Sequence, residues 1–374
     1  MPVPMLDLVA QNVVVKQKIL DGLSAITDRC TFVLGENVRG LESELADYCC
    51  TKYSVGMSSG TDALLVAMMA LGIGSGDEII IPSFTFFATG GVVARLGAKP
   101  VFADIDPQTF NATPSAIEAA ITDRTKAIMP VHLFGQLADM PKIMEIANAM
   151  GIPVIEDACQ SLGAKGWGKN AGQFGQITGC SFYPTKNLGA FGDAGLALIR
   201  DNEELFRKIM RLRVHGMEPV YVHHEVGING RLDEFQALVL RAKLPFLEEW
   251  HVGRRKNAQW YSENLQSLCP VDFQIPLEIV PNGRHIYNQF TVRIKKGRRD
   301  EFQNHLKAKG IGSSIFYPIP LHLQPCFEYL GYRNGSLPET ELSAKEVISL
   351  PIYPEMTEEM LEEVASAVMG FFRA

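Results

Sequence analysis

The chain has 374 residues, of which 47% are hydrophobic and 21% are charged, and its formal net charge is −7. This length exceeds one ordinary hydrophobic core, so we expect two domains, and the acidic balance argues against a protein that holds nucleic acid through phosphate contacts. Seven scattered cysteines without a Cys-x-x-Cys pair indicate a reduced, cytoplasmic protein, and we expect it to hold no metal.

The sequence also gives no sign of a membrane protein. Its first residues lack the basic and apolar regions of a signal peptide. No apolar stretch reaches the roughly 20 residues that a membrane span needs. We therefore expect no contact with a membrane.

The first half of the chain alternates between predicted helices and strands. Helical spacing of apolar residues is found at residues 12–29 and 38–49. Further along, the expected strands are 53–57, 78–82, 99–103, 126–131 and 153–156, and the helices between them are 62–71, 84–96, 115–121 and 140–150. Several of these strands are continuous apolar runs, which predicts a mostly parallel, doubly wound α/β sheet. Ligands of such sheets bind at the carboxyl ends of the strands.

The second half predicts a smaller α+β domain. A helical, charge-rich segment at residues 241–260 looks like a connector. After it we expect strands at 287–294 and 311–316 and helices at 299–309, 341–348 and 357–372. The division therefore falls near residue 248, with a large α/β domain at 1–248 and a small domain at 249–374.

Two of the strand ends carry polar residues with two interpretations each. The turn Ser58-Ser59-Gly60-Thr61 opens a helix, whose free N–H groups and dipole favour an anion such as phosphate. The alternative is a plain N-cap by Ser59 or Thr61. Asp157 closes another strand, where a carboxylate is costly unless something positive meets it. It is either a helix N-cap or the partner of a cationic ring nitrogen.

A third feature is Lys186, which lies at a turn after an apolar strand in Ser181-Phe182-Tyr183-Pro184-Thr185-Lys186-Asn187-Leu188-Gly189. It is either a solvated surface lysine or a lysine that forms a Schiff base with a carbonyl compound. Together with Asp157 and the helix N-terminus, it specifies pyridoxal phosphate (PLP), which has an aldehyde, a pyridine nitrogen and a phosphate.

Neighbouring residues extend this hypothesis. Phe84 or Phe86 could lie over the pyridine ring or pack in the core, and Gln160 could hydrogen-bond the ring hydroxyl. A dinucleotide-binding enzyme is disfavoured, because the glycines at 72, 74 and 76 follow a predicted helix and not a strand.

The motifs resemble those of the DegT/DnrJ/EryC1/StrS family of PLP-dependent nucleotide-sugar aminotransferases, a fold-type-I group. The resemblance extends from residue 4 to residue 354, and its main motifs are residues 59–64, 82–86, 156–160, 181–189 and 227–234. It implies that PLP is bound covalently by Lys186. The remaining cofactor contacts that it implies are Gly60, Thr61, Phe86, Asp157, Gln160 and Ser181.

The resemblance also implies partners. Asn229 resembles a residue that reaches the phosphate of the neighbouring subunit's cofactor, so a homodimer with shared active sites is expected. Tyr317 and His322 resemble substrate-side contacts, although each could equally serve domain packing. Gly230 and Asn288 depart from residues common in the family, which leaves the identity of the sugar open.

The implied reaction moves an amino group from L-glutamate to a keto sugar carried on dTDP or UDP. The form Tyr-Pro-Thr-Lys-Asn-Leu-Gly around Lys186 resembles the branch that acts on 3-keto sugars, and amination at C4 is the alternative. A PLP-dependent sugar dehydratase of the same fold is a further alternative, but its relatives replace the lysine. The last alternative is a PLP-binding sensor with an aminotransferase-like body.

Overall fold

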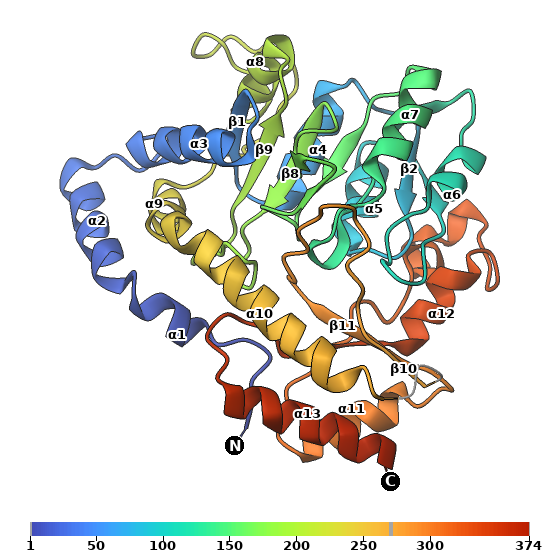
Figure 1. Cartoon of the computed structure of the whole chain (residues 1–374). Helices are drawn as coiled ribbons and strands as arrows, with labels where there is room; N and C mark the ends of the chain where they lie inside the picture. Colours follow the sequence, from blue (N-terminus) through green and yellow to red (C-terminus); the bar gives the residue numbers. More distant parts are fainter. Residues whose placement is uncertain (1, 269–271, 374) are drawn as a thin grey trace.

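We describe the fold from a computed structural model, which covers residues 2–268 and 272–373. The α-helices are α1 (Leu8–Val13), α2 (Lys16–Arg29), α3 (Glu36–Cys49), α4 (Gly60–Ala70), α5 (Phe87–Arg95), α6 (Pro114–Ala119), α7 (Met140–Met150), α8 (Glu203–Leu212), α9 (Glu234–Lys243), α10 (Leu247–Leu265), α11 (Arg299–Ala308), α12 (Pro338–Glu346) and α13 (Glu358–Arg373). The strands are β1 (Tyr53–Met57), β2 (Glu78–Pro82), β3 (Lys99–Ala103), β4 (Thr125–Ile128), β5 (Ile155–Asp157), β6 (Lys165–Gly166), β7 (Lys169–Asn170), β8 (Ile177–Ser181), β9 (Gly195–Ile199), β10 (Phe273–Gln274), β11 (Phe290–Ile294) and β12 (Val347–Leu350). Figure 1 shows their arrangement.

The large sheet is almost wholly parallel, as expected. Strands β3, β2 and β4 pair in parallel, and so do β5 and β8. Parallel bridges from Ile128 to Val154 and from Val131 to Asp157 join these two groups, so the order is β3-β2-β4-β5-β8-β9-β1. Only β9 runs against its neighbours in this sheet, because it pairs antiparallel with both β8 and β1. The carboxyl ends of the other strands therefore share one edge.

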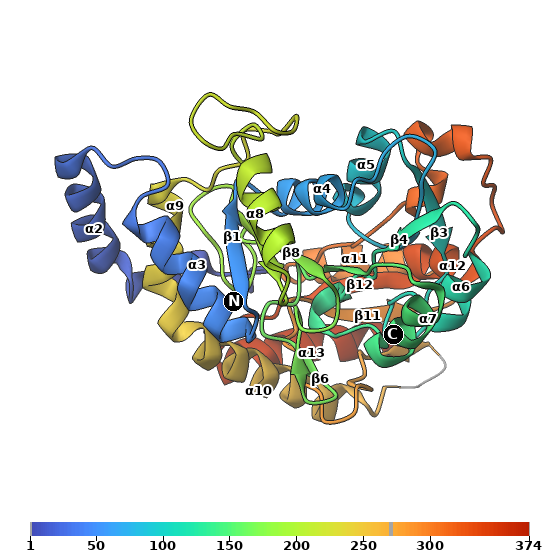
Figure 2. The same ribbon diagram turned by 90° about the horizontal axis from the view of Figure 1, so that it is seen from above.

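Helices cover both faces of this sheet. Along β2, Ile79 and Ile81 belong to one hydrophobic core and Ile80 to another, as the two-residue period of a strand requires. Helices α4, α5 and α8 supply the first of these cores, while α3, α6, α7, α9 and the start of α10 supply the second. Figure 2 shows α4 and α5 together on one side of the sheet. Both faces of the sheet are therefore buried under helices, which explains the continuous apolar runs in the sequence.

The small domain is an antiparallel sheet in the order β10-β11-β12, covered by α10, α11 and α13. Helix α10 also reaches the large domain, because Leu247 packs in a core of the large sheet and Tyr261 packs in the small-domain core. Val3 lies in the small-domain core too and pairs with Ile311. We retain the division at residue 248 as a proposal; it falls in the first turn of α10.

Three predicted elements differ from those observed. The single helix expected at 12–29 is two helices, since α1 ends at Val13 and α2 begins at Lys16. The strand expected at 311–316 is limited to isolated bridges at Ile311 and Ser314. The helix expected to reach residue 348 ends at Glu346, because Val347–Leu350 pairs with β11 as a fully buried strand. Tertiary pairing overrides local helical spacing at this point.

Within residues 2–268 and 272–373, every helix is too short or too polar to cross a bilayer.

Candidate active site

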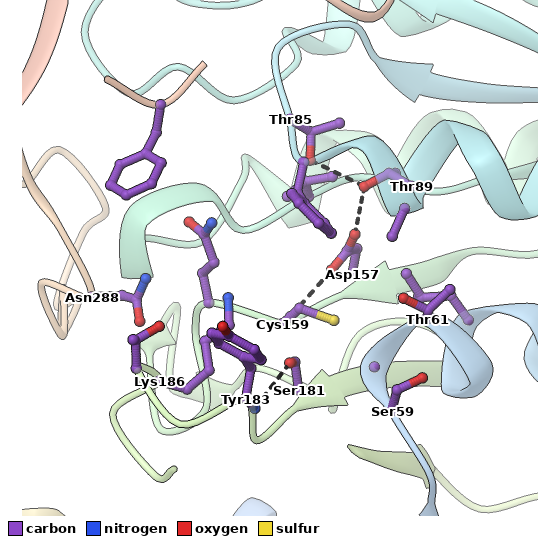
Figure 3. Close-up of a pocket in the computed structure, with 18 of the residues that line it drawn as sticks. Ser59, Thr61, Thr85, Thr89, Asp157, Cys159, Ser181, Tyr183, Lys186 and Asn288 are labelled. Atoms are coloured by element: carbon purple, nitrogen blue, oxygen red, sulfur yellow. Dashed lines mark hydrogen bonds between the residues drawn. The ribbon is translucent and has the colours of Figure 1, made fainter. Parts of the chain in front are cut away.

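A cavity of about 530 Å³ opens where the carboxyl ends of β1, β2, β5 and β8 meet. Each of these strands is followed by a segment that lines the cavity: residues 59–61, 85–89, 157–160 and 181–186. The small domain closes the cavity with Asn288, Gln289, Phe316 and Tyr317. Figure 3 shows the side chains of these segments converging on one space. The position agrees with the rule that ligands bind at the carboxyl ends of parallel strands.

Lys186 reaches this cavity from a tight turn after β8. Its backbone N–H bonds to the carbonyl of Tyr183 at 2.8 Å. Gly189 is needed to close the turn, because a Cβ there would lie 2.2 Å from the Pro184 carbonyl oxygen. The Lys186 side chain is half-buried, and its amine makes no hydrogen bond or ion pair with any residue that the structure describes. Burial lowers the pKa of the amine, while Cys159 and Asp157 oppose that shift.

Asp157 is buried at the end of β5 with its carboxylate held by two donors. One oxygen accepts a hydrogen bond from Thr89 Oγ1 at 2.8 Å, and the other accepts from the Cys159 N–H at 3.1 Å. Thr89 in turn contacts Thr85 at 3.1 Å between their hydroxyl oxygens. The Cys159 bond resembles local capping, yet the carboxylate also lines the cavity. No cation among the described residues pairs with it, so a buried negative charge is left for a ligand to meet.

The N-terminus of α4 forms a third wall. Ser59 caps the helix by accepting the Asp62 N–H at 3.0 Å, as the simpler interpretation predicted. The N–H groups of Gly60 and Thr61 keep no main-chain acceptor, as is usual in a first turn. Gly60 packs closely on the end of β8, since a Cβ there would lie 2.7 Å from the Ser181 Cβ. The helix end and Ser181 therefore form one corner of the cavity, and free N–H groups at a helix N-terminus favour an anion there.

The two phenylalanines predicted as ring contacts lie in different environments. Phe84 is fully buried in a core with Phe110, whereas Phe86 lines the cavity and is 58% exposed. Gln160 accepts a hydrogen bond from the Phe134 N–H at 2.8 Å and donates to the Tyr317 hydroxyl at 2.9 Å. Phe86, Gln160 and Tyr317 therefore line one side of the cavity together.

Two expected site residues lie outside this cavity. Asn229 is exposed and is absent from the lining, so it is not brought to the Lys186 of its own chain. His322 is 1% exposed, with Nδ1 2.7 Å from Ser83 Oγ and Nε2 3.1 Å from Glu341 Oε1. Both ring nitrogens have partners within the protein, which favours the domain-packing alternative for His322 over a substrate contact.

Sequence reasoning missed several residues of the site. Thr89 orients the Asp157 carboxylate, and the only sequence signal for it is a hydroxyl among the mostly apolar residues of α5. Asn288 was noted only as a departure from the family, yet it lines the cavity. Cys159 lines it as well, two residues after Asp157.

The residues present fit PLP. An amine without a partner, a carboxylate without a cation and a helix N-terminus line one cavity, and these match the aldehyde, the ring nitrogen and the phosphate of that cofactor. In the part of the chain that the structure describes, no group of three or more His, Cys, Asp or Glu residues could hold a metal ion.

Comparison with known proteins gives a family match over nearly the whole chain. The model of the DegT/DnrJ/EryC1/StrS aminotransferase family matches residues 14–369. A relative from Geobacillus stearothermophilus named pleiotropic regulatory protein is 48% identical over 100% of this chain and 99% of its own. A relative from Acidithiobacillus ferrooxidans is 45% identical over 98% of this chain and 97% of its own. It is named UDP-N-acetyl-3-dehydro-alpha-D-glucosamine 3-aminotransferase.

Solved structures show the same likeness. The crystal structure of DesV from S. venezuelae, in complex with a ketimine intermediate, has a TM-score of 0.95 and 38% identity, covering 100% of this chain and 99% of that one. The structure of ntda from Bacillus subtilis with bound cofactor PMP has a TM-score of 0.92 and 32% identity, covering 100% of this chain and 86% of that one.

Proposed function

Because the chain belongs to the DegT/DnrJ/EryC1/StrS aminotransferase family, we propose that it transfers an amino group from L-glutamate to a keto sugar carried on a nucleotide, with PLP as cofactor. The observation that carries this proposal is the meeting of Lys186, Asp157 and the N-terminus of α4 in one cavity. When bound, PLP would supply an electron sink for the charge left as the donor α-carbon loses its proton.

Lys186 has two tasks in this proposal. Its amine would bind the aldehyde of the cofactor covalently. When free, the same amine would accept the proton that leaves the donor α-carbon and return it later in the reaction. Burial lowers the pKa of this amine, which increases the fraction that is neutral and able to accept that proton. A solvated surface lysine would lack this advantage.

Asp157 keeps a proton on the ring nitrogen of the cofactor. Its two hydrogen bonds, from Thr89 and from the Cys159 N–H, fix the direction of the carboxylate. The other proposed contacts are Phe86 against the ring, Gln160 at the ring hydroxyl, and Gly60, Thr61 and Ser181 at the phosphate. Tyr317 is proposed to contact the substrate, because it lines the same cavity beside Gln160.

We propose C3 as the position of amination and leave the nucleotide as UDP or dTDP. The Acidithiobacillus relative, at 45% identity, is named for amino transfer at C3 of a UDP-linked sugar. Amination at C4 is the second choice. The experiment is to incubate the enzyme with L-glutamate and a UDP-linked 3-keto sugar or its 4-keto isomer, and to identify the aminosugar by mass spectrometry and NMR. Product from the 4-keto isomer alone would reject the C3 assignment.

The half-reaction itself is tested by a visible spectrum. We expect a Schiff-base band in the purified protein that disappears with excess L-glutamate, and no such band in Lys186→Ala. Lys307→Ala, which removes an exposed lysine of α11, is the matched control and should behave as wild type. We expect Lys186→Ala to lose more than the roughly 10²–10⁴-fold that general acid–base catalysis contributes. A protein that shows no band after PLP is added would overturn the proposal.

A regulatory function is the second candidate, because the Geobacillus relative at 48% identity is named a regulatory protein. The same spectrum separates the two candidates. An aminotransferase loses its band with glutamate and recovers it with a keto acceptor, whereas a sensor binds PLP without this cycle.

We further propose a homodimer with shared sites, in which Asn229 serves the phosphate of the neighbouring subunit. Its exposed position, away from its own cavity, supports this arrangement. Lys186→Ala and Asn229→Ala should each be impaired alone. After mixing and subunit exchange, about a quarter of the wild-type sites should recover, because one site of each mixed dimer carries neither substitution. No recovery in dimers shown to have exchanged would exclude shared sites.

A further inference from the structure

A second and much smaller cavity lies against Lys186. It measures about 10 Å³, which is room for about one water molecule. Lys186 lines it together with the polar side chains of Ser161, Asn187 and Asn288. Lys186 and Asn288 also line the large cavity, so the small cavity adjoins the candidate active site.

Three residues that line this small cavity each have a buried side-chain oxygen without a hydrogen-bond partner. These oxygens are Ser161 Oγ, Asn187 Oδ1 and Asn288 Oδ1, and none bonds to any residue within 2–268 or 272–373. Their side chains belong to residues that are 0%, 3% and 5% exposed, respectively. Buried polar atoms are nearly always hydrogen-bonded in folded proteins. Three oxygen atoms without hydrogen bonds, on residues that line one space of this size, indicate a common hydrogen-bonding partner within that space.

The side chains of Gln160, Ser181 and Cys159, which also line this cavity, already have partners. Gln160 is bonded to the Phe134 N–H and to Tyr317. Ser181 Oγ accepts the Tyr183 N–H at 3.4 Å, and the Cys159 thiol lies 3.7 Å from the Gly179 carbonyl oxygen. Asn187 is oriented independently of the cavity, because its Nδ2 donates to the Ile286 carbonyl at 3.1 Å, and this bond turns Oδ1 the other way.

We propose that this cavity binds one structural water molecule that holds the Lys186 amine in place. Each donor and acceptor of the water then has one partner. The water donates its two hydrogens to Asn187 Oδ1 and Asn288 Oδ1, and its two lone pairs accept from the Ser161 hydroxyl and from a Lys186 N–H. All three orphan oxygens are then satisfied, and Lys186 gains a fixed neighbour.

The chemistry of the lining also says what this water does not do. Amide oxygens accept hydrogen bonds but take up no proton at neutral pH, and the Ser161 hydroxyl has no further partner among the described residues, so the chain of groups ends at Ser161, Asn187 and Asn288. A proton that Lys186 removes from a donor carbon therefore has no exit through this water. The site positions the amine and retains its proton, a role that rests on the proposed function, whereas the water site itself does not.

The first test is a crystal structure of the purified holoenzyme, at a resolution that defines ordered waters, with Asn288→Leu alongside. We expect one density peak within about 2.7–3.2 Å of all three oxygens in the wild type, and none in Asn288→Leu. Side chains that pair directly with one another, with no peak, would overturn the proposal. So would a peak at about 2.3–2.6 Å, which is a cation's distance.

The second test measures the amine in solution and does not depend on turnover. The rate of Schiff-base formation after PLP is added to the apoprotein is recorded against pH, and its midpoint reports the pKa of Lys186. Loss of an accepting water destabilises the ammonium form, so Asn288→Leu and Ser161→Ala should move the midpoint downward, the former by about 1 pH unit or more.

Gln289→Leu is the matched control. It removes the next side chain along, which lines the large cavity but not the small one, and it should leave the midpoint unchanged. Identical midpoints in Asn288→Leu and the wild type would overturn the proposal. If Asn288→Leu does not fold, the midpoint of Ser161→Ala is compared with that of the wild type instead. A confirmed water in a protein that ignores glutamate would separate this inference from a failure of the proposed function.

Discussion

Gly195 packs against the peptide group between Ser59 and Gly60, at the proposed phosphate corner of the cavity, and its replacement gives the sharpest prediction. It opens β9 and pairs with Met57 of β1 and Ser181 of β8. A Cβ built on Gly195 would lie 2.2 Å from the Ser59 carbonyl carbon, 2.3 Å from the Ser59 oxygen and 2.5 Å from the Gly60 nitrogen. Ordinary contact begins at 3.4 Å, so Gly195→Ala must displace the Ser59–Gly60 peptide by about 3.4 − 2.2 = 1.2 Å.

The expected magnitude follows from that displacement. The obstructing atoms are main chain, held between β1 and α4, so no side-chain rotation relieves the clash. Overpacking of this kind costs about 1–3 kcal/mol of stability. A shift of about 1 Å also takes the first N–H groups of α4 out of hydrogen-bond range of a phosphate. Losing one bond to a charged group costs about 1.5–3 kcal/mol, so PLP affinity should fall by about 10- to 100-fold.

Two measurements check this prediction, and each has a control. Absorbance titration of the apoprotein gives the PLP affinity, and urea unfolding of the apoprotein gives the stability. Gly192→Ala is the matched control, because its Cβ would meet only the end of the Gln236 side chain, at 3.1 Å. If Gly195→Ala bound PLP as tightly as Gly192→Ala does, the proposed phosphate corner would be wrong.

Three further predictions concern groups around the site. His322→Leu should lower the free energy of unfolding by roughly 1–3 kcal/mol, since Glu341 loses a buried partner, but leave the KM for the sugar unchanged; a raised KM would restore the substrate role. Burial lowers the pKa of Lys243 to about 8, so above that pH the unfolded chain binds more protons than the folded protein. In urea titrations, the stability of the wild type should therefore rise by about 2 kcal/mol from pH 7.5 to pH 9.5. Lys243→Met should lack this rise, and an equal rise in both proteins would refute the prediction. Burial alone would raise the pKa of Glu156, but His132 and nearby backbone N–H groups lower it, so stability should fall as acid protonates this carboxylate below the ordinary range of a carboxyl. Glu156→Gln weakens hydrogen bonds to a charged group, so in urea titrations it should lose about 1.5–3 kcal/mol at neutral pH and flatten that acid dependence. An acid dependence equal to that of the wild type would contradict this.

Much of the site was predictable because strand ends carry local signals. Apolar runs that stop at Asp157 and before Lys186 indicate strands that deliver a polar group to the sheet edge. The structure brings both residues to one cavity with Gly60 and Ser181. No local pattern predicts Thr89, because its relation to Asp157 arises only when α5 folds back onto the end of β5. The same limit applies to Asn288, which comes from the other domain.

The errors in the fold have a similar cause. Strand β9 was not among the predicted elements, and its antiparallel direction depends on pairing with β1, far away in the sequence, which its own residues do not specify. Residues 347–350 continue a helical spacing, yet they form a buried strand because β11 offers an open edge. The sequence left two interpretations of His322 open, because a histidine near substrate-side motifs looks the same in sequence whether it faces a cavity or bonds to Glu341.

The pairing of Val3 with Ile311 has a consequence for how the protein is made. These two residues are 311 − 3 = 308 positions apart, yet they share one core with Phe290 and Leu361. A ribosome that adds about 5–20 residues each second needs about 15–60 seconds to join them. Val3 and its apolar neighbours therefore remain unpaired while the residues of the large sheet are synthesised. Contacts of such long sequence separation slow folding, and completion of the small domain depends on the chain returning to its own beginning.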